Sequence, residues 1–593
     1  MNSIKKLLIL ALLGVCCSAA QINAGPLAEK AAAFDKLVAA SHLPRGLVVN
    51  MQPIAGSAGL RFRSAGDSTI WTGAYIASQV YRYRVSGDSA ALEQIEKCLT
   101  AFVHLHNMAG RQGFIGRSYG TREELGDGPD IIAGIGSYSQ LCFKADTSRD
   151  QYTGIFMGCA LAWPHIRDPQ LREEVRAMIT AAAGNLMANH LALRVNINGQ
   201  APTTFNLNPD YAYQDRINPE EWARVDDFPA NLFVAAVPYS DRLAAIMGRF
   251  KPPAVRGGEA LRALLMFQTA GNISENRALV EYFHENLLKQ RQLHLIASET
   301  SQLLSDIYLG RNQAVVENRL YGTISAAGKV FIDVLAMRAG IPDSLALWLQ
   351  PCTMLPVNLA AAFYTEKIMQ IFAFIRQPGA MSLCTVVADH LTKMAASLGM
   401  FRAERAAARL DNYAQQLRSF AASNLDEFSD TMRSYVGCNL GFFALLGILD
   451  QPSSPLLREA ALAILPRSFE PISDEANSMY TFITAAFCRQ AVSDQALAAA
   501  RQTLLLYPEN QLNRQFDHRG TLAASPWPDR FGRVGRQSRQ LIPIDQRAPH
   551  IFIWQEPPRQ LVTGSDDQTR VAPVGYLLAY WFGRYHALLN END

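Results

Sequence analysis

Apolar residues recur at helical spacing along most of the chain, and almost no segment alternates apolar and polar residues as a strand does. The spacing predicts a helix over residues 68–85, a stop and cap at 86–88 (SGD), and a second helix ending near Met108. The apolar positions of that second helix repeat every three or four residues, at Leu92, Ile95, Leu99, Phe102, Val103 and Leu105. The pattern is typical of an antiparallel helical hairpin.

The same two-helix unit recurs along the chain. The predicted pairs are 150–167 with 169–190, 257–271 with 275–291, 356–377 with 380–398, 432–449 with 454–465, and 475–489 with 493–507. The first helix of several pairs is nearly apolar all round, so it must be buried on every side, whereas its partner is amphipathic. Small residues line these apolar helices at steps of three or four: Gly154, Gly158 and Ala162 in one, Gly437, Gly441 and Ala444 in another. We therefore predict an all-α fold, an α/α toroid of about six or seven helical hairpins.

Three long stretches lack the helical pattern: residues 109–149, 191–227 and 508–570. Loops of such length in a compact protein are usually functional. On a toroid we expect them to gather at one end and shape the mouth of the central cavity. After the last of them, Val571–Leu589 again predicts a helix, and its aromatic residues are expected to pack against residues 68–108 and close the ring.

The first 24 residues have the pattern of a secretory signal peptide. Lys5 and Lys6 precede an unbroken apolar run at 7–17, and small residues follow at 18–20. The apolar run is too short to span a bilayer. We therefore expect an exported protein, periplasmic or extracellular, whose mature part (residues 25–593) is a single domain.

Cys16 and Cys17 raise the alternative of a lipoprotein, since a lipidated cysteine ends such a leader. The residue before Cys16 is Val15, where lipoprotein processing usually needs alanine or glycine. The sequence therefore favours soluble export over a lipid anchor.

Composition narrows the class of partner. Charged residues make up 18% of the 593-residue chain, hydrophobic residues 49%, and the formal net charge is +2. These values are typical of a globular protein and give no global sign of a nucleic-acid partner. After the leader we predict no transmembrane span, because Pro356 and Lys367 interrupt the closest candidate at 344–376. The oligomeric state stays open.

Seven cysteines follow the leader, far apart and mostly within apolar helical patterns: Cys98, Cys142, Cys159, Cys352, Cys384, Cys438 and Cys488. We expect most of them to be small buried hydrophobes, and one or two disulfides stay open as an alternative.

Several local motifs resemble those of uncharacterised bacterial exported proteins that group with the six-hairpin glycosidase-like toroids. The motifs are 67–73 (DSTIWTG) with 86–88 (SGD), the helix opening 150–154 (DQYTG), and the tail 554–555 (WQ) followed by 575–586 (GYLLAYWFGRYH). The resemblance covers most of the mature chain and implies a carbohydrate-active protein, since this fold group includes glycoside hydrolases and polysaccharide lyases. It is an analogy of fold, and fold alone does not fix function.

Asp150 and Glu475 are the candidate catalytic carboxylates for glycosidic hydrolysis. Each stands at the start of a largely apolar helix, and the ends of inner helices surround the cavity of a toroid. Hydrolysis needs two carboxyl groups, ~5 Å apart in retaining enzymes and ~6.5–9.5 Å apart in inverting ones. Asp150 or Ser148 can instead cap its helix. For Glu475 the cap role is less needed, because Ser473 or Asp474 can fill it.

Four further residues are candidates for substrate binding, three of them near helix starts and Trp554 in the stretch 508–570. Asp67 precedes the helix at 68–85 and can equally cap it. Trp71, Tyr152 and Trp554 are candidate platforms for sugar rings, and each can instead belong to the core.

The stretch 508–570 contains nine arginines and no lysine. A planar guanidinium suits carboxylates and sulfates, so the stretch can bind an acidic polysaccharide, or its arginines can tie the loop to its own seven acidic residues. Elimination of a uronate-containing chain is the alternative reaction. It would use Arg519 or Arg547 as neutraliser and Tyr119, Tyr152 or His518 as base.

Other chemistries lack their usual motifs. No C-x-x-C, HExxH, EF-hand loop, G-x-S-x-G, P-loop or G-x-G-x-x-G occurs, and His104 and His106 are spaced so that they do not share a helix face. We therefore predict no metal and no cofactor. The absence of a sharp catalytic motif keeps a third class open, a non-catalytic envelope protein that binds glycans or proteins.

Overall fold

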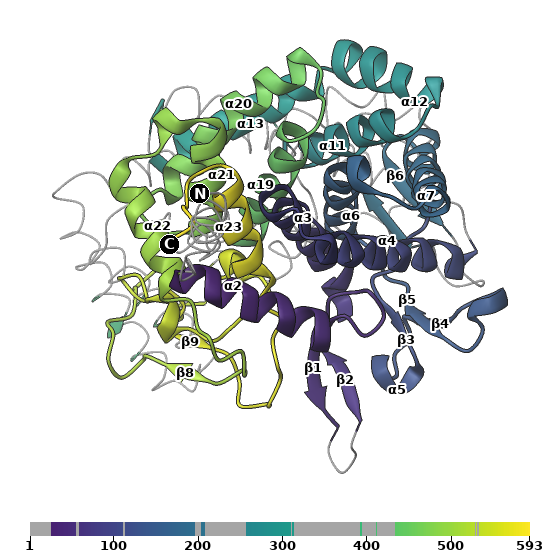
Figure 1. Cartoon of the computed structure of the whole chain (residues 1–593). Coiled ribbons are helices and arrows are strands. Elements are labelled where there is room, and N and C mark those ends of the chain that lie inside the picture. The colour runs from purple at the N-terminus through teal and green to yellow at the C-terminus, as the bar shows by residue number, and fades with distance from the viewer. Residues whose placement is uncertain are drawn as a thin grey trace, which may run out of the picture.

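The computed structural model describes residues 25–195 (except 55–58, 64, 111 and 112), 203–207, 257–312 (except 310) and 433–593 (except 528 and 530–532), with isolated helical residues between 358 and 415. This described chain is mostly helical with a few short strands (Figure 1), which confirms the all-α class. The expected signal peptide, the expected hairpin at 356–398 and most of the stretch 191–227 lie outside the described residues.

Six largely buried helices of the described chain form a closed series of contacts. They are α3 (Ser68–Ser86), α6 (Arg149–Ala162), α11 (Gly257–Ile273), α19 (Tyr435–Leu449), α21 (Ser478–Phe487) and α23 (Val574–Tyr585). In this order each helix contacts the next, and α23 contacts α3; α19 also contacts α6 (Figure 1). The nearly all-apolar pattern of α6 and α19 explains why both are buried around their circumference.

A second, more exposed helix follows five of these six, so the hairpins predicted from periodicity are confirmed to within a few residues. These helices are α4 (Ser89–Ala109), α7 (Pro169–Ala188), α12 (Arg277–Glu281) with the π-helix η7 (Tyr282–Gln290), α20 (Pro455–Phe469) and α22 (Asp494–Leu505). Two helices of more than ten residues in the described chain were not predicted. α2 (Pro26–Leu37) packs on α22 and α23, and α13 (Leu293–Leu309) packs on α11 and α20.

Side-chain caps fix where several helices begin. Asp88 accepts a hydrogen bond from the Ala90 amide at the start of α4, as the SGD motif predicted, and Gly87 ends α3 in the left-handed region with φ 67°. Asp168 caps α7 in the same way, and Ser434, Ser454 and Ser493 cap α19, α20 and α22.

Short antiparallel strands lie in the three predicted non-helical stretches and in the segment before α3. β3 (Tyr119–Gly120), β5 (Cys142–Lys144) and β4 (Ile131–Ala133) form one sheet in that order, next to the short helix α5 (Arg122–Leu125). The two-stranded pairs are β1 (Asn50–Pro53) with β2 (Leu60–Arg63), β6 (Ala192–Val195) with β7 (Thr203–Asn206), and β8 (Phe516–Asp517) with β9 (Val562–Thr563). All except β6 and β7 lie in the lower half of Figure 1, so strands from distant parts of the sequence lie toward the same end of the molecule in this view.

Short helical turns complete the described elements. The single-turn 3₁₀ and π segments are η1 (Val38–His42), η2 (Ala65–Asp67), η3 (Gly136–Tyr138), η4 (Trp163–His165), η8 (Glu470–Ile472), η9 (Arg489–Ala491), η10 (Ile544–Gln546) and η11 (Ile553–Gln555).

Glycines allow α3 and α6 to approach each other at backbone distance. A Cβ added to Gly73 would lie 2.0 Å from the carbonyl oxygen of Gly154, and one added to Gly154 would lie 2.4 Å from Cα of Ile70. Gly158 in turn faces Gly73. The small-residue pattern therefore brings the starts of α3 and α6 side by side, which positions the candidate site.

We expect Gly154→Ala to lower the free energy of unfolding by about 3 kcal/mol, because the new methyl group meets main-chain atoms that cannot rotate away. Gly184→Ala in α7 is the matched control, since its Cβ would meet no atom within 4 Å. That substitution should stabilise by roughly 0.5–1 kcal/mol, the ordinary helix preference for alanine. Equilibrium urea unfolding measures both, and equal effects would contradict the close approach of the helices.

The C-terminal helix α23 packs against α3, which confirms the predicted contact between the chain's end and its first hairpin. Tyr576 Oη donates a hydrogen bond to the carbonyl oxygen of Leu27 over 2.8 Å. Trp581 Nε1 donates to Asp35 Oδ2 over 2.9 Å. Both ends of the described chain therefore belong to one core.

The cysteines of the described chain are free thiols, at Cys98, Cys142, Cys159, Cys438 and Cys488. Cys98, Cys159 and Cys488 are buried, which confirms for them the expected role of small hydrophobes. Cys352 and Cys384 lie outside the described residues. Among the helices described, none has the length and apolar character needed to cross a membrane.

Candidate functional site

Asp67 and Asp150 lie at the starts of the two closely packed helices α3 and α6. Gln151 joins them: its Oε1 accepts hydrogen bonds from Thr69 Oγ1 (2.6 Å) and the Ile70 amide (3.3 Å). Its Nε2 donates to Asp67 Oδ1 over 3.0 Å. The buried glutamine thus holds the two helix starts, and the carboxylates beside them, in a fixed relation.

Neither carboxylate is used as a helix cap, although the sequence allowed that explanation for both. Asp67 occupies the N-cap position of α3 and makes no side-chain capping bond. Ser148 occupies that position in α6, also without one. Ser68 instead donates to the carbonyl oxygen of Val48. Neither carboxylate is therefore used to cap the start of its helix.

Two arginines place positive charge beside Asp150. Arg149 Nε and Arg262 Nη1 each lie 3.8 Å from Asp150 Oδ1. That oxygen is buried and accepts no hydrogen bond, yet the side chain as a whole remains 29% exposed. The exposure therefore lies at the rest of the side chain, which includes Oδ2. Glu259 balances the arginines, 2.8 Å from Arg149 Nη1.

Asp67 is the more exposed member of the pair, with 55% of its side chain accessible. The surrounding protein raises the pKa of Asp67 by desolvation, and the negative charge of Asp150 adds to the rise. Arg117, whose Nη1 donates to Asp67 Oδ1 over 3.2 Å, opposes it together with the Gln151 hydrogen bond. His550 is close enough to act on Asp67 in the same opposing sense. Asp67 therefore holds a proton to higher pH than an isolated aspartate.

Glu475 lies in a different environment, a buried ion pair. Its Oε1 is 2.5 Å from Arg433 Nη1 and accepts a hydrogen bond from Tyr435 Oη over 2.6 Å, and the side chains of Glu475 and Arg433 are both 2% exposed. The expected helix start at Glu475, capped by Ser473 or Asp474, was wrong. α21 begins at Ser478, and its cap is Asn477, which accepts from the Tyr480 amide.

The three candidate sugar platforms are core residues. Trp71 is 2% exposed and stacks on Phe552, with ring centroids 5.3 Å apart. Trp554 is equally buried and donates from Nε1 to the carbonyl oxygen of Gly575 over 2.7 Å. Tyr152 is fully buried, and its hydroxyl bonds the carbonyl oxygen of Gly113. Protein covers the ring faces, so the expectation that a sugar stacks on them is corrected.

The residues expected for β-elimination do not share one environment: Tyr119 is buried, whereas His518 and Arg519 lie at the surface. Tyr119 is 5% exposed, its hydroxyl donates to the carbonyl oxygen of Arg45 over 2.8 Å, and burial raises its pKa to about 12. His518 is at the surface and donates from Nε2 to the carbonyl oxygen of Gln546. Arg519 is exposed and pairs with Asp517. Arg519 therefore already has a carboxylate partner, and Tyr119 is poorly suited to act as a base.

Arg547 and His550 line a cavity of about 350 Å³ formed by the 508–570 stretch and by strand residues near the N-terminus. His550 links this cavity to Asp67 electrostatically. Its Nε2 lies 3.5 Å from Glu556 Oε1 on the cavity wall. The 508–570 stretch therefore contributes most of one cavity wall, which includes His550, a residue for which the sequence offered no individual role.

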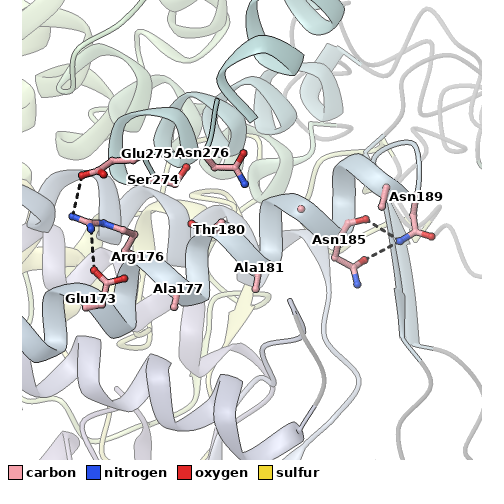
Figure 2. Close-up of a pocket in the computed structure, with 12 residues that line it drawn as sticks. Glu173, Arg176, Ala177, Thr180, Ala181, Asn185, Asn189, Ser274, Glu275 and Asn276 are labelled. Carbon is pink, nitrogen blue, oxygen red and sulfur yellow. Dashed lines mark hydrogen bonds and ion pairs between the residues drawn. The ribbon is translucent and has the colours of Figure 1, made fainter. Parts of the chain in front are cut away.

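A second cavity of about 880 Å³ lies between α7 and the segment that joins α11 to α12 (Figure 2). Arg176 on its wall pairs with Glu173 (2.9 Å) and lies 3.8 Å from Glu275. Asn189 Nδ2 bonds both the backbone and side-chain oxygens of Asn185. No sequence pattern predicted this cavity, because polar residues on an amphipathic helix usually face solvent.

Within the described ranges, no group of three or more His, Cys, Asp or Glu side chains is placed to hold a metal ion. Comparison with known proteins finds no family model, no curated protein and no solved structure that matches this chain.

Proposed function

We propose that this protein is an exported glycoside hydrolase whose active site lies at the starts of α3 and α6. One observation carries the proposal: Asp67 and Asp150, two partly exposed carboxylates with no capping role, lie beside each other in unlike electrostatic environments. A carboxyl group whose surroundings raise its pKa, next to a second carboxylate, is the usual equipment for glycosidic cleavage.

The arrangement of helices supports the proposal at the level of fold. The closed series of contacts from α3 through α23 and back to α3 is what an α/α toroid requires, with α4, α7, α20 and α22 outside it. On such a fold the starts of the inner helices surround one mouth. The proposed toroid therefore gives Asp67, Asp150 and the 508–570 stretch a common opening.

Asp67 is the proposed general acid. Its raised pKa keeps a proton available for the leaving oxygen of the glycosidic bond. Asp150, with Arg149 and Arg262 beside one oxygen, is the proposed anionic partner, either as nucleophile or as the base that activates water. This proposal assigns Asp67 the role that the sequence suggested for Glu475, because the Glu475 carboxylate is buried against Arg433 and Tyr435.

The test is an assay of the purified protein against a panel of neutral and acidic polysaccharides and oligosaccharides. Hydrolysis releases new reducing ends without absorbance near 232 nm, whereas elimination creates a conjugated double bond that absorbs there. Reducing ends alone, from at least one glycan, support the proposal. Products absorbing near 232 nm would reassign the reaction to a lyase, and glycan binding without turnover would make the protein a carbohydrate-binding one.

A further inference from the structure

Arg547 is a buried cation that makes no hydrogen bond through its guanidinium within the described part of the chain. The residue is 8% exposed, and its Nε is fully covered without a partner. Burial lowers the pKa of Arg547 to about 10, so it is still charged at neutral pH. An arginine presents five donors, and a buried charge without hydrogen-bonded partners is costly. Within the described chain, the guanidinium of Arg547 therefore lacks a hydrogen-bond acceptor.

The acidic groups on the walls of the same cavity are already engaged. Glu556 faces His550 at 3.5 Å. Asp567 accepts hydrogen bonds from Asn513 Nδ2 and the Thr569 amide, both 3.0 Å, and lies 3.5 Å from Arg63. Glu475, which is not among the residues that line the cavity, exerts the largest attraction on Arg547, and its Oε1 accepts hydrogen bonds from Arg433 and Tyr435. The acceptor for Arg547 is thus expected to come from a molecule that enters the cavity.

The cavity has the size and place of a sugar subsite. Its volume of about 350 Å³ is in the lower part of the range for small-molecule sites. His550 on its wall also acts on Asp67, so the cavity and the proposed catalytic carboxylates are neighbours. A planar carboxylate matches the guanidinium fork with two parallel hydrogen bonds.

We propose that Arg547 and its cavity bind the carboxylate of a uronic acid residue in the substrate, next to the bond that Asp67 and Asp150 cleave. The inference rests on the proposed function and names its substrate class, an acidic glycan. In this proposal the 508–570 stretch binds substrate through one buried arginine, Arg547. The exposed Arg519 pairs with Asp517 at the surface and has no such role.

The experiment measures binding rather than turnover. Glucuronate and galacturonate are titrated into the full-length protein by NMR, each against its uncharged methyl ester and against glucose 6-sulfate. Wild-type protein should bind a free uronate about 10- to 100-fold more tightly than its ester, as expected for charge-assisted hydrogen bonds. Arg547→Gln should remove that preference, and Arg547→Lys should weaken it while keeping the charge. Arg536→Gln, at an exposed arginine of the same stretch, should bind like wild type.

Thermal unfolding separates a ligand-binding arginine from a structural one. Arg547→Gln should melt at or above the wild-type temperature, because a buried charge without a hydrogen-bonded partner is removed. Equal uronate preference in wild type and Arg547→Gln, or a lower melting temperature of this variant, would overturn the inference. Preference for the sulfate over the uronate would overturn the choice of carboxylate. Hydrolysis of neutral glycans without uronate binding would refute this subsite alone, whereas uronate binding without hydrolysis would refute the proposed function alone.

Discussion

Replacing Asp150 with asparagine is expected to lower the rate of glycan hydrolysis about 10²- to 10⁴-fold, and Asp67→Asn by a similar factor. Asparagine keeps the shape of the side chain and removes its charge or its transferable proton. At Asp150 the substitution leaves Arg149 and Arg262 in place but removes the negative charge beside them. The measurement is initial-rate release of reducing ends from whichever glycan the panel identifies.

The pH dependence should reveal which carboxyl group is the acid. Catalysis that needs protonated Asp67 declines as pH rises through its raised pKa, so the alkaline side of the activity profile belongs to this residue. In Asp150→Asn the pKa of Asp67 should fall, because the charge of Asp150 is one of the causes of its rise. Carbon-13 NMR of the Asp67 carboxyl group follows this change directly, even in an inactive variant.

The matched control is Asp127→Asn, whose side chain is 87% exposed and pairs only with Arg122 among the described ion pairs. It should keep wild-type activity. Full activity in both Asp67→Asn and Asp150→Asn would refute the assignment of these two residues. An effect confined to Glu475→Gln, with folding intact, would return the role to the buried glutamate.

Deletion of residues 571–593 is expected to abolish cooperative folding. Five of the larger side chains of α23 are fully buried: Tyr576, Leu577, Leu578, Tyr580 and Phe582. At about 1.5–3 kcal/mol for each such side chain, their burial is of the same order as the whole stability of a domain, about 5–15 kcal/mol. Removal would also expose the face of α3 that α23 covers.

Circular dichroism and thermal unfolding test this prediction. The deletion variant should show a broad transition or none. Truncation after Leu589 is the control, since it removes the last residues beyond α23 and leaves the helix and the buried Leu589 in place. If the long deletion melts at the full-length temperature with unchanged helicity, then α23 is an appendage and the closed series of contacts is not needed for folding.

Periodicity predicted the helices well because a helix that packs on the core must carry apolar residues at helical spacing on its buried side. The apolar stripes of α4 and α7 indicate which side of each helix is buried, and the all-apolar run of α19 indicates burial on every side. The caps Asp88 and Ser454 can be predicted because each depends only on neighbouring residues in the sequence. α2 and α13 escaped prediction, although their local sequences are helical. The strand pairs of two to four residues are too short to produce an alternating pattern.

The candidate site was predicted only in part, because it depends on contacts between distant segments. Asp150 could be selected from its place at the start of an apolar helix. Its partner could not, since the proximity of Asp67 follows from the backbone contact of Gly73 with Gly154. Trp71 shows the converse error: an aromatic residue near a helix start has the same sequence pattern whether it faces a cavity or packs on Phe552 in the core. Trp554, in η11 of the 508–570 stretch, is likewise buried.

The hydrogen bond from Tyr576 to Leu27 has a consequence for how the chain is made, because it joins residues 549 positions apart. At roughly 5–20 residues per second of synthesis, about half a minute to two minutes pass between the appearance of these two residues. Hairpins such as α3 with α4 can form early from local contacts, whereas the contact of α3 with α23 must wait for the last segment. Until then the nascent chain carries an uncovered apolar helix face, so it needs protection from aggregation for as long as it is being made.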